Sequence, residues 1–244
     1  MAKLIKKLKG HSGVSVNLYD NNTVVKSGYT KARQSVEILE KLPFNTPHVY
    51  SVTDDTITME YVAGEDIGSY FEHGDNESVD SIIKFIDKYF DWCLSNSQPY
   101  SFDDELEFKV LELGPFMNMG PVVANLKYDM PKSVIHGDFT FDNILHKDGE
   151  FYLIDANPTP LSSIHFDGAK LRQDLDGYWF LRNRENNSNI KICCLKIREH
   201  LKFKYKFMNN NALYSFMLSR ILPYSKDEQT TKFLTKEMNK VWPL

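Results

Sequence analysis

Three oxygen-bearing side chains near the middle of the chain stand at spacings that suit a metal-bound polyphosphate. Asp138 and Asn143 lie in the stretch His-Gly-Asp-Phe-Thr-Phe-Asp-Asn, and Asp155 follows twelve residues after Asn143. Phosphoryl transfer needs positioning and charge neutralisation more than covalent help from the protein. A carboxylate beside the attacking hydroxyl and two oxygen ligands for Mg²⁺ would meet that need. We therefore predict that Asp138 orients or deprotonates an acceptor hydroxyl and that Asn143 and Asp155 bind Mg²⁺.

The segment between Asn143 and Asp155 indicates how these two residues could meet. Residues 143–146 and 150–154 are predicted to form strands around Asp148-Gly149, a dipeptide typical of tight hairpin turns. Because the strands of a hairpin run back along each other, Asn143 and Asp155 are expected at the same end of one sheet.

These motifs resemble the catalytic and metal-binding loops of the protein-kinase-like phosphotransferases, and the aminoglycoside phosphotransferase and choline kinase branch fits best. That branch has His-Gly-Asp where most protein kinases have His-Arg-Asp, and the step from Asp138 to Asn143 matches the kinase signature. The resemblance implies an α+β, bilobal fold, with a small antiparallel-sheet N-lobe (1–63) and a larger, mainly helical C-lobe (64–244). It also implies ATP or GTP as the phosphate donor, Mg²⁺ as the metal, and a small-molecule hydroxyl as the acceptor.

The first part of the chain contains segments that resemble the nucleotide-binding elements of this family. Gly10, Ser12 and Gly13 lie in a turn between predicted strands, where backbone amides could cover phosphates, although an ordinary β-turn is the alternative. The resemblance implies that Lys26, which ends a β-branched run, pairs with the α- and β-phosphates. A lysine at a strand end is otherwise simply solvated.

Residues 56–64 resemble the fifth strand and hinge of the family. The resemblance implies that the backbone near Glu60 and Val62 bonds the edge of a purine. Backbone contacts of this kind leave no side-chain signature, so the sequence does not separate ATP from GTP.

Residues 30–42 have helical spacing and correspond to the helix that should present a glutamate to Lys26. At about 100° per residue, Ser35 lies in the middle of the apolar face, Glu40 lies at its edge and Glu37 points further away. The helical phase favours Glu40 over Glu37 as the partner of Lys26. The alternative is that this ion pair is absent or is formed by other residues.

The resemblance also assigns supporting roles to two residues of the site. His136 is expected to tie the catalytic loop to the metal-binding strand, rather than to act as a base. Asp167, in a segment that resembles Asp-x-Ala of the family, is expected to brace the catalytic loop. The metal-binding loop has Asp-Ala-Asn in place of Asp-Phe-Gly, so regulation by a phenylalanine switch is not expected.

The remainder of the chain is rich in predicted helices. Their ranges are 76–96, 103–113, 167–183, 190–208, 211–221 and 226–241. The first carries a long apolar stripe and is expected to lie beneath the catalytic loop. An acidic cluster opens the second, where it either favours the helix N-terminus or attracts a cationic acceptor.

Composition agrees with a globular intracellular enzyme. The chain has 244 residues, 42% of them hydrophobic, and a formal net charge of −4, which argues against general nucleic-acid binding. No signal peptide or membrane span is apparent, so we expect a cytoplasmic location without membrane insertion. The three cysteines, Cys93, Cys193 and Cys194, are expected to be reduced and buried.

The acceptor is the least determined part of this interpretation. We rank a sugar, polyol or amino-alcohol above an aminoglycoside antibiotic, which would favour a more acidic C-lobe. Residues 170–178 resemble kinase-like proteins associated with surface-polysaccharide synthesis. The short segment after Asp155 argues against a protein kinase, and the presence of Lys26, Asp138, Asn143 and Asp155 argues against an inactive binding module.

Overall fold

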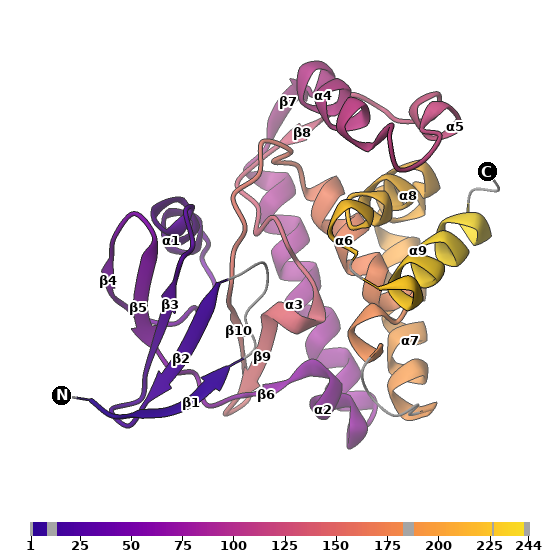
Figure 1. Ribbon diagram of the computed structural model, residues 1–244. Helices are drawn as coiled ribbons and strands as arrows, with labels where there is room; N and C mark the ends of the chain where they lie inside the picture. Colours follow the sequence, from indigo (N-terminus) through magenta and orange to yellow (C-terminus); the bar gives the residue numbers. More distant parts are fainter. Residues whose placement is uncertain (1, 9–13, 183–187, 226, 242–244) are drawn as a thin grey trace.

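The computed structural model describes residues 2–8, 14–182, 188–225 and 227–241. A sheet-rich N-lobe stands beside a larger helical C-lobe, and the chain begins and ends at opposite sides of the molecule (Figure 1). The order of elements confirms the predicted α+β architecture, in which an antiparallel sheet precedes a mainly helical part.

The N-lobe is a five-stranded antiparallel sheet covered by one helix. Its strand order is β1-β2-β3-β5-β4, formed by β1 (Leu4–Leu8), β2 (Ser15–Tyr19), β3 (Thr23–Ser27), β5 (Thr56–Glu60) and β4 (Val49–Val52). Helix α1 (Ala32–Lys41) packs Ala32 and Val36 against Ile57 of the sheet. The apolar spacing of residues 30–42 therefore predicted both the helix and its buried face, whereas β4 was not predicted.

The C-lobe is built mainly from helices. They are α2 (Ile67–Glu72), α3 (Asn76–Ser95), α4 (Asp103–Leu113), α5 (Gly120–Val123), α6 (Ile164–Leu175), α7 (Ser188–Lys204), α8 (Asn211–Ser219) and α9 (Glu228–Val241). Short 3₁₀ turns are η1 (Phe141–Asn143), η2 (Trp179–Leu181), η3 (Lys206–Asn209) and η4 (Leu222–Tyr224). The predicted helix over 190–208 is interrupted at Tyr205, where the backbone becomes extended before η3 begins.

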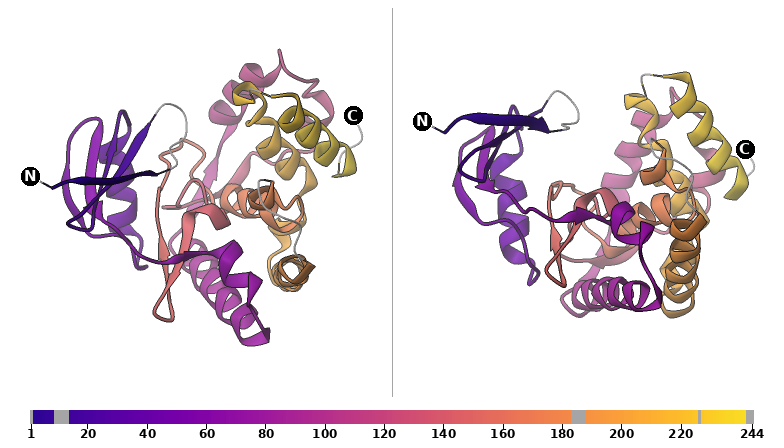
Figure 2. Two further views of the ribbon diagram at one scale, coloured as in Figure 1. Left: turned by 60° about the horizontal axis from the view of Figure 1, so that its bottom comes forward. Right: turned by 90° about the horizontal axis from the view of Figure 1, so that it is seen from below.

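Helix α3 is the central support of the C-lobe. The Asp75 side chain caps its N-terminus by accepting a hydrogen bond from the Ser78 amide at 2.9 Å. Its apolar stripe is buried in the main core, together with residues of the catalytic loop and of α7. Both views in Figure 2 show α3 beside α7, in agreement with the packing of the two helices. Sequence periodicity predicted this helix to within one residue.

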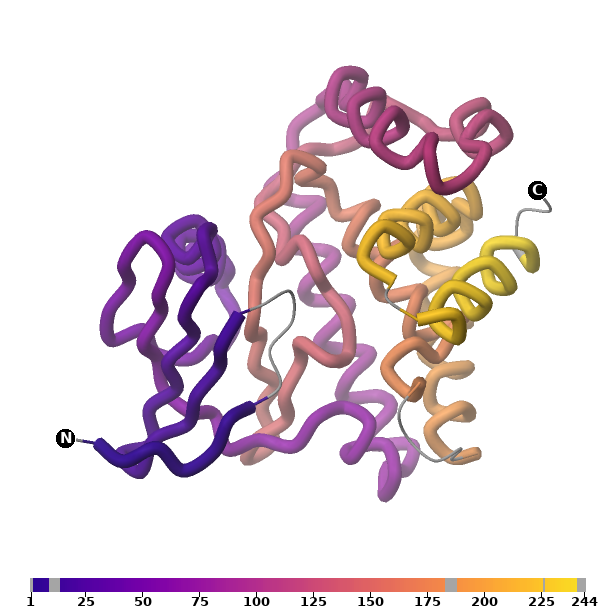
Figure 3. The backbone as a smooth tube through the Cα atoms, in the orientation of Figure 1, coloured from indigo at the N-terminus to yellow at the C-terminus, as the bar shows by residue number. Residues whose placement is uncertain are grey.

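Two small sheets complete the C-lobe. One has the order β10-β9-β6, with β6 (Glu65–Asp66), β9 (Ile144–Lys147) and β10 (Glu150–Leu153), and the other pairs β7 (Gln98–Ser101) with β8 (Asp129–Lys132). At the β9–β10 turn, Asp148 and Gly149 have φ values of 52° and 84°, as the predicted tight hairpin requires. The backbone tube shows this part of the chain running between the N-lobe and the C-lobe helices (Figure 3).

The three cysteines are free and buried, which confirms the expectation from the sequence. Within the described part of the chain, none of the helices has the length and apolar character needed to cross a bilayer.

Candidate active site

The catalytic-loop segment has a backbone conformation that only glycine tolerates at its second position. Gly137 has a φ of +79°, and a Cβ built there would lie 2.0 Å from the carbonyl oxygen of Asn157. An L side chain would therefore meet both an unfavourable backbone region and a steric clash. This explains in physical terms why the chain has His-Gly-Asp and not His-Arg-Asp.

His136 joins the catalytic loop to the strand that precedes Asp155. Its Nε2 lies 2.7 Å from the carbonyl oxygen of Ile154, and its Nδ1 accepts a hydrogen bond from the Asp138 amide at 3.3 Å. Because a carbonyl can only accept, Nε2 carries the proton and Nδ1 does not. The ring is fully buried and both of its nitrogens are occupied. This geometry fits the predicted structural role.

Asp167, in α6, gathers the backbone of the catalytic loop around one carboxylate oxygen. Its Oδ2 accepts hydrogen bonds from the Tyr89 hydroxyl at 2.6 Å, the His136 amide at 3.0 Å and the Gly137 amide at 3.2 Å. Burial raises the pKa of Asp167 above its ordinary value, although His136 and these donors oppose the shift. The carboxyl lies where a brace for the loop was predicted.

Asp138 is half-buried and held from two sides. The Asn143 amide donates to its Oδ2 at 3.0 Å and to its backbone oxygen at 2.8 Å, while Lys170 Nζ lies 3.0 Å from its Oδ1. Burial alone would raise the pKa of Asp138, but the Lys170 ammonium and the hydrogen bond from Asn143 act against burial, and the pKa lies below the ordinary value. Asp138 is therefore an anion at neutral pH.

Asp155 and Lys26 meet where the N-lobe contacts the C-lobe. Lys26 Nζ lies 3.2 Å from Asp155 Oδ1, and it also sits over the ring of Tyr29, 4.2 Å from the centroid. Asp155 has a φ of +57°, an uncommon conformation for a residue other than glycine, and its side chain is 42% exposed. Strained backbone of this kind is concentrated at functional sites. A half-exposed carboxylate beside a lysine is well suited to bind a metal–phosphate complex.

The helix that should supply a glutamate to Lys26 supplies a serine to the metal-binding loop instead. Glu37 and Glu40 are both exposed, and among the described residues the ion-pair partner of Lys26 is Asp155. Ser35 is buried and its hydroxyl donates to the carbonyl oxygen of Ala156 at 2.5 Å. Neither glutamate that phase left open therefore pairs with the lysine.

Two backbone amides of the predicted hinge already donate hydrogen bonds within the protein. The Glu60 amide donates to His48 and the Tyr61 amide donates to Asn22, at 2.8 and 2.9 Å. Val62 is buried, and its amide has no backbone partner within the described ranges. The backbone near Glu60 and Val62 stays our predicted contact to the purine edge, and the amide of Val62 is the group here without a backbone partner among the described residues. Gly10, Ser12 and Gly13 lie outside the described residues.

Several residues important to this geometry were not predicted from the sequence. Tyr89 stacks on Phe139 with ring centroids 4.1 Å apart, and it lies on the same helical stripe as Ile82 and Ile86, so its phase was a usable signal. Lys170 had no such signal, because its contact with Asp138 spans two segments far apart in the chain.

Asp174 also holds the backbone of this loop, and it was not predicted from the sequence. Its two oxygens accept hydrogen bonds from the Phe141 amide at 2.7 Å and the Phe180 amide at 3.1 Å. Burial raises the pKa of Asp174 to about 8, against the effect of those two donors. It stands two helical turns after Asp167 in α6, so one face of this helix braces both ends of the catalytic loop.

The residues predicted to bind Mg²⁺ have suitable free oxygens. The amide nitrogen of Asn143 is used by Asp138, which leaves its Oδ1 for a cation, and Asp155 uses only one oxygen for Lys26. The Ile154 amide donates to the Asn143 carbonyl at 3.1 Å, so both ligands lie at one end of the hairpin. A hard cation that keeps several water ligands needs no larger protein cage. The donor set therefore fits Mg²⁺.

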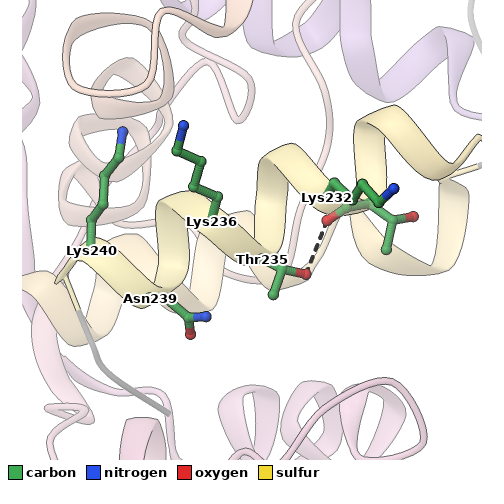
Figure 4. A pocket seen from close by; sticks show the side chains of 6 residues that line it. Lys232, Thr235, Lys236, Asn239 and Lys240 are labelled. Carbon is green, nitrogen blue, oxygen red and sulfur yellow. Dashed lines mark hydrogen bonds between the residues drawn. The ribbon is translucent and has the colours of Figure 1, made fainter.

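Two surface hollows lie elsewhere on the molecule. One, of about 550 Å³, runs along α9 and is lined by Thr231, Lys232, Thr235, Lys236, Asn239 and Lys240 (Figure 4). The other, of about 490 Å³, lies behind the catalytic loop, where Lys41 and Lys132 are among its lining residues. Neither contains Asp138, Asn143 or Asp155, so the site is defined by its contacts and not by either hollow.

No family model and no curated protein matches the chain, whereas solved structures match it over nearly its whole length. An aminoglycoside phosphotransferase, APH(4)-Ia, has a TM-score of 0.65 at 12% identity, covering 98% of this chain and 93% of its own. A glucosamine kinase has a TM-score of 0.62 at 12% identity, covering 99% and 81%. A gentamicin complex of APH(2")-IIa has a TM-score of 0.61 at 16% identity, covering 99% and 91%.

Likeness at these identities establishes the fold. The chain has the fold that the matched aminoglycoside phosphotransferases and the glucosamine kinase share.

Proposed function

We propose that this protein transfers the γ-phosphate of ATP to a hydroxyl group of a small molecule. The observation that carries the proposal is the convergence of Lys26, Asp138, Asn143 and Asp155. Lys26 contacts Asp155 and Asn143 contacts Asp138, at 3.2 and 3.0 Å. The Ile154–Asn143 backbone bond brings the two pairs together, although the residues span most of the N-terminal two-thirds of the chain.

The transfer step assigns a distinct role to Asp138. The acceptor oxygen forms a bond to the γ-phosphorus as the bond from that phosphorus to the β,γ-bridging oxygen breaks, and ADP leaves. Asp138, held as an anion, accepts the hydrogen bond of the acceptor hydroxyl and takes its proton as the new bond forms. The lowered pKa makes this carboxylate a better orienting group than a strong base.

The nucleotide would lie between Lys26 and the metal-binding residues. Lys26 is freed from Asp155 to contact the α- and β-phosphates, and Asn143 and Asp155 hold the metal through their free oxygens. Bound Mg²⁺ would neutralise charge on the β- and γ-phosphates. Among solved structures of this fold, a glucosamine kinase is bound to glucosamine, ADP and inorganic phosphate, and an APH(4)-Ia variant to ADP and hygromycin B. These complexes support ATP as the donor.

A small acceptor is favoured by the segment after Asp155. Helix α6 begins at Ile164, nine positions later, which leaves little chain for a platform that docks a protein substrate. Sugars, polyols and amino-alcohols are the classes we propose, with surface-glycan precursors suggested by the likeness of residues 170–178. An aminoglycoside remains the second candidate, because kinases of both substrate types share this fold.

Acceptor-dependent release of ADP from ATP tests the proposal. Asp138→Asn should lower kcat by at least a hundredfold while preserving Mg²⁺-dependent ADP binding, because it removes the proton acceptor and leaves the metal ligands in place. The matched control is Asp142→Asn, which changes an exposed carboxylate of the same loop that faces Arg182 at 3.6 Å. Full turnover by Asp138→Asn would refute the assigned role, and failure of the wild type to bind Mg²⁺-nucleotide would refute the function.

A further inference from the structure

Arg220 lacks the carboxylate partner that every other described arginine has. Arg33, Arg172, Arg182 and Arg198 each lie within 4.0 Å of an aspartate or glutamate. No such contact involves Arg220 anywhere in the described ranges. The Arg220 residue is partly buried, and among the described residues an NH group of its guanidinium donates to the Met217 sulfur at 3.3 Å.

This arrangement is costly unless a ligand completes it. A guanidinium has five N–H donors, and a thioether is a weak acceptor. Removing a cation from water without a counter-charge is strongly unfavourable. Burial lowers the pKa of Arg220, and the charge of Asp138 acts in the opposite direction, so the two side chains feel each other's field. This effect agrees with the packing of α6 on α8, which brings the helix of Arg220 against the helix of Lys170, the partner of Asp138.

The packing of α6 on α8 places a second cation on the same side. Gln173 of α6 donates to the Met217 carbonyl of α8 at 3.2 Å and fastens the two helices together. Lys170 lies one turn before Gln173, and Arg220 lies one turn after Met217. Lys170 reaches Asp138 directly, at 3.0 Å. Two helices thus contribute one cation each to the acceptor side of the site.

Counting charges on this side leaves a positive excess. Lys170 neutralises Asp138, and Glu112, the glutamate whose charge also acts on Arg220, is paired with Lys109 at 2.5 Å. The charge of Arg220 is left without a partner. The acidic residues that open α4 are not among the charges that act on Arg220, and two of them, Glu105 and Asp103, accept hydrogen bonds from Tyr100 and Ser101 near the N-terminus of that helix.

We propose that the acceptor carries an anionic group, a carboxylate or a phosphate, in addition to the hydroxyl that is phosphorylated, and that Arg220 binds this group. The inference rests on the proposed function and narrows its acceptor class to acidic or phosphorylated sugars and polyols. It argues against polycationic acceptors, because their amines would face Arg220 and Lys170 at close range. Lys170 stays with Asp138 and positions it beside the acceptor hydroxyl.

The experiment compares acceptors that share one ring and differ in charge. Purified full-length protein with Mg²⁺-ATP is assayed for ADP release with glucose, glucuronate, a hexose phosphate and glucosamine, and with the corresponding galactose series. We expect kcat/KM to be highest for an acid or a phosphate, and the pair of anionic compounds identifies which group is bound. Arg220→Gln should lower the ratio of kcat/KM for the anionic acceptor to that for the neutral one by about tenfold or more, as expected for a lost charge-assisted hydrogen bond.

Arg33→Gln is the matched control, since it removes an exposed arginine that pairs with Asp54 on the N-lobe. It should leave the charge preference unchanged. A preference for neutral or amino sugars in the wild type, or an unchanged ratio in Arg220→Gln, overturns the inference while leaving the kinase function in place.

A binding measurement decides the matter if no compound of the panel is phosphorylated. Inorganic sulfate is titrated into protein saturated with Mg²⁺-ADP, so that the nucleotide site is filled. We expect saturable binding that Arg220→Gln weakens about tenfold and Arg33→Gln does not. Equal sulfate binding by both variants, or none by the wild type, overturns the inference. Absence of ADP binding instead indicates failure of the proposed function.

Discussion

At the scale of single residues, Ser35 lies on the helix where the sequence predicted a glutamate partner for Lys26. The Ser35 hydroxyl bonds the carbonyl of Ala156, directly after the strained Asp155, so it fixes the metal-binding loop without a charge. Lys26 then pairs with Asp155 itself. The serine and the lysine thus hold two adjacent residues, Ala156 and Asp155, from the N-lobe side.

Ser35→Ala should therefore weaken nucleotide binding more than its small size suggests. Loss of a buried hydrogen bond costs about 1–3 kcal/mol, and here, among the described residues, the Ala156 carbonyl would keep only the longer bond from the Tyr29 hydroxyl at 3.5 Å, next to the proposed metal ligand Asp155. We expect the Kd for Mg²⁺-ADP to rise about fivefold to a hundredfold, measured by titration calorimetry. Ser51→Ala, at an exposed position of β4, serves as control. An unchanged Kd in Ser35→Ala would show that the loop is held by other contacts.

Lys170 sets the protonation of Asp138, which predicts a pH effect. Burial raises the pKa of Asp138 and Lys170 is the main group that lowers it, so Lys170→Met should move this pKa upward. The acid limb of the pH profile of kcat/KM should shift to higher pH. A lowered pKa of Asp138 in the folded state adds to the free energy of unfolding at pH values above the unfolded-state pKa. This contribution is lost as the pH falls through the folded-state pKa. Lys170→Met should lack this contribution.

Lys204→Met is the control for this experiment, because Lys204 pairs with Asp87 and Asp91 on another part of the C-lobe. Its pH profile should match the wild type. An identical acid limb in Lys170→Met would mean that another cation controls Asp138.

At the scale of elements, substitutions in two turns can show why Gly137 is a glycine. Either its positive φ or the lack of room for a side chain could require it. Gly137 and Gly149 both have positive φ, of +79° and +84°. An added Cβ at Gly137 would clash with Asn157, whereas one at Gly149 would meet nothing within 4 Å. Gly149→Ala should cost about 1–2 kcal/mol of unfolding free energy from backbone strain alone.

Gly137→Ala should cost clearly more, and it should also abolish turnover because the loop that carries Asp138 must move. Urea unfolding of the two variants measures the difference. Equal destabilisation would show that the Asn157 segment yields easily to the added methyl group.

The elements also show which features a sequence can predict. The β9–β10 hairpin follows from Asp148-Gly149, α3 follows from periodicity and its polar start, and α4 follows from periodicity, because these signals are local. The β7–β8 pair and the Lys170–Asp138 contact join segments that are about thirty residues apart, so no local sequence pattern predicts them. Ser35 is an intermediate case. The sequence predicted its position on the apolar face of α1, but it did not predict its hydrogen bond to the Ala156 carbonyl.

At the scale of the whole molecule, the contacts of the N-lobe with the C-lobe include several to the segment that begins at Asp155. Lys26 contacts Asp155, Ser35 contacts Ala156 and Lys31 donates to the Pro158 carbonyl at 3.1 Å. The N-lobe is thus joined to this segment at three residues, Asp155, Ala156 and Pro158. A ligand that binds between the lobes should consequently stabilise both of them together.

Mg²⁺-ADP should raise the melting temperature of the wild type. At a ligand concentration one hundred times Kd, linkage gives about 2.7 kcal/mol, which corresponds to about 5–11 °C for a chain of this size. Asp155→Asn removes a metal ligand charge, so the Mg²⁺-dependent part of this increase should disappear while binding of metal-free ADP changes little. Asp54→Asn, at a 93% exposed side chain, should behave as the wild type. Thermal unfolding with and without Mg²⁺ measures each effect. A full Mg²⁺-dependent increase in Asp155→Asn would place the metal elsewhere and remove the central support for phosphoryl transfer at this site.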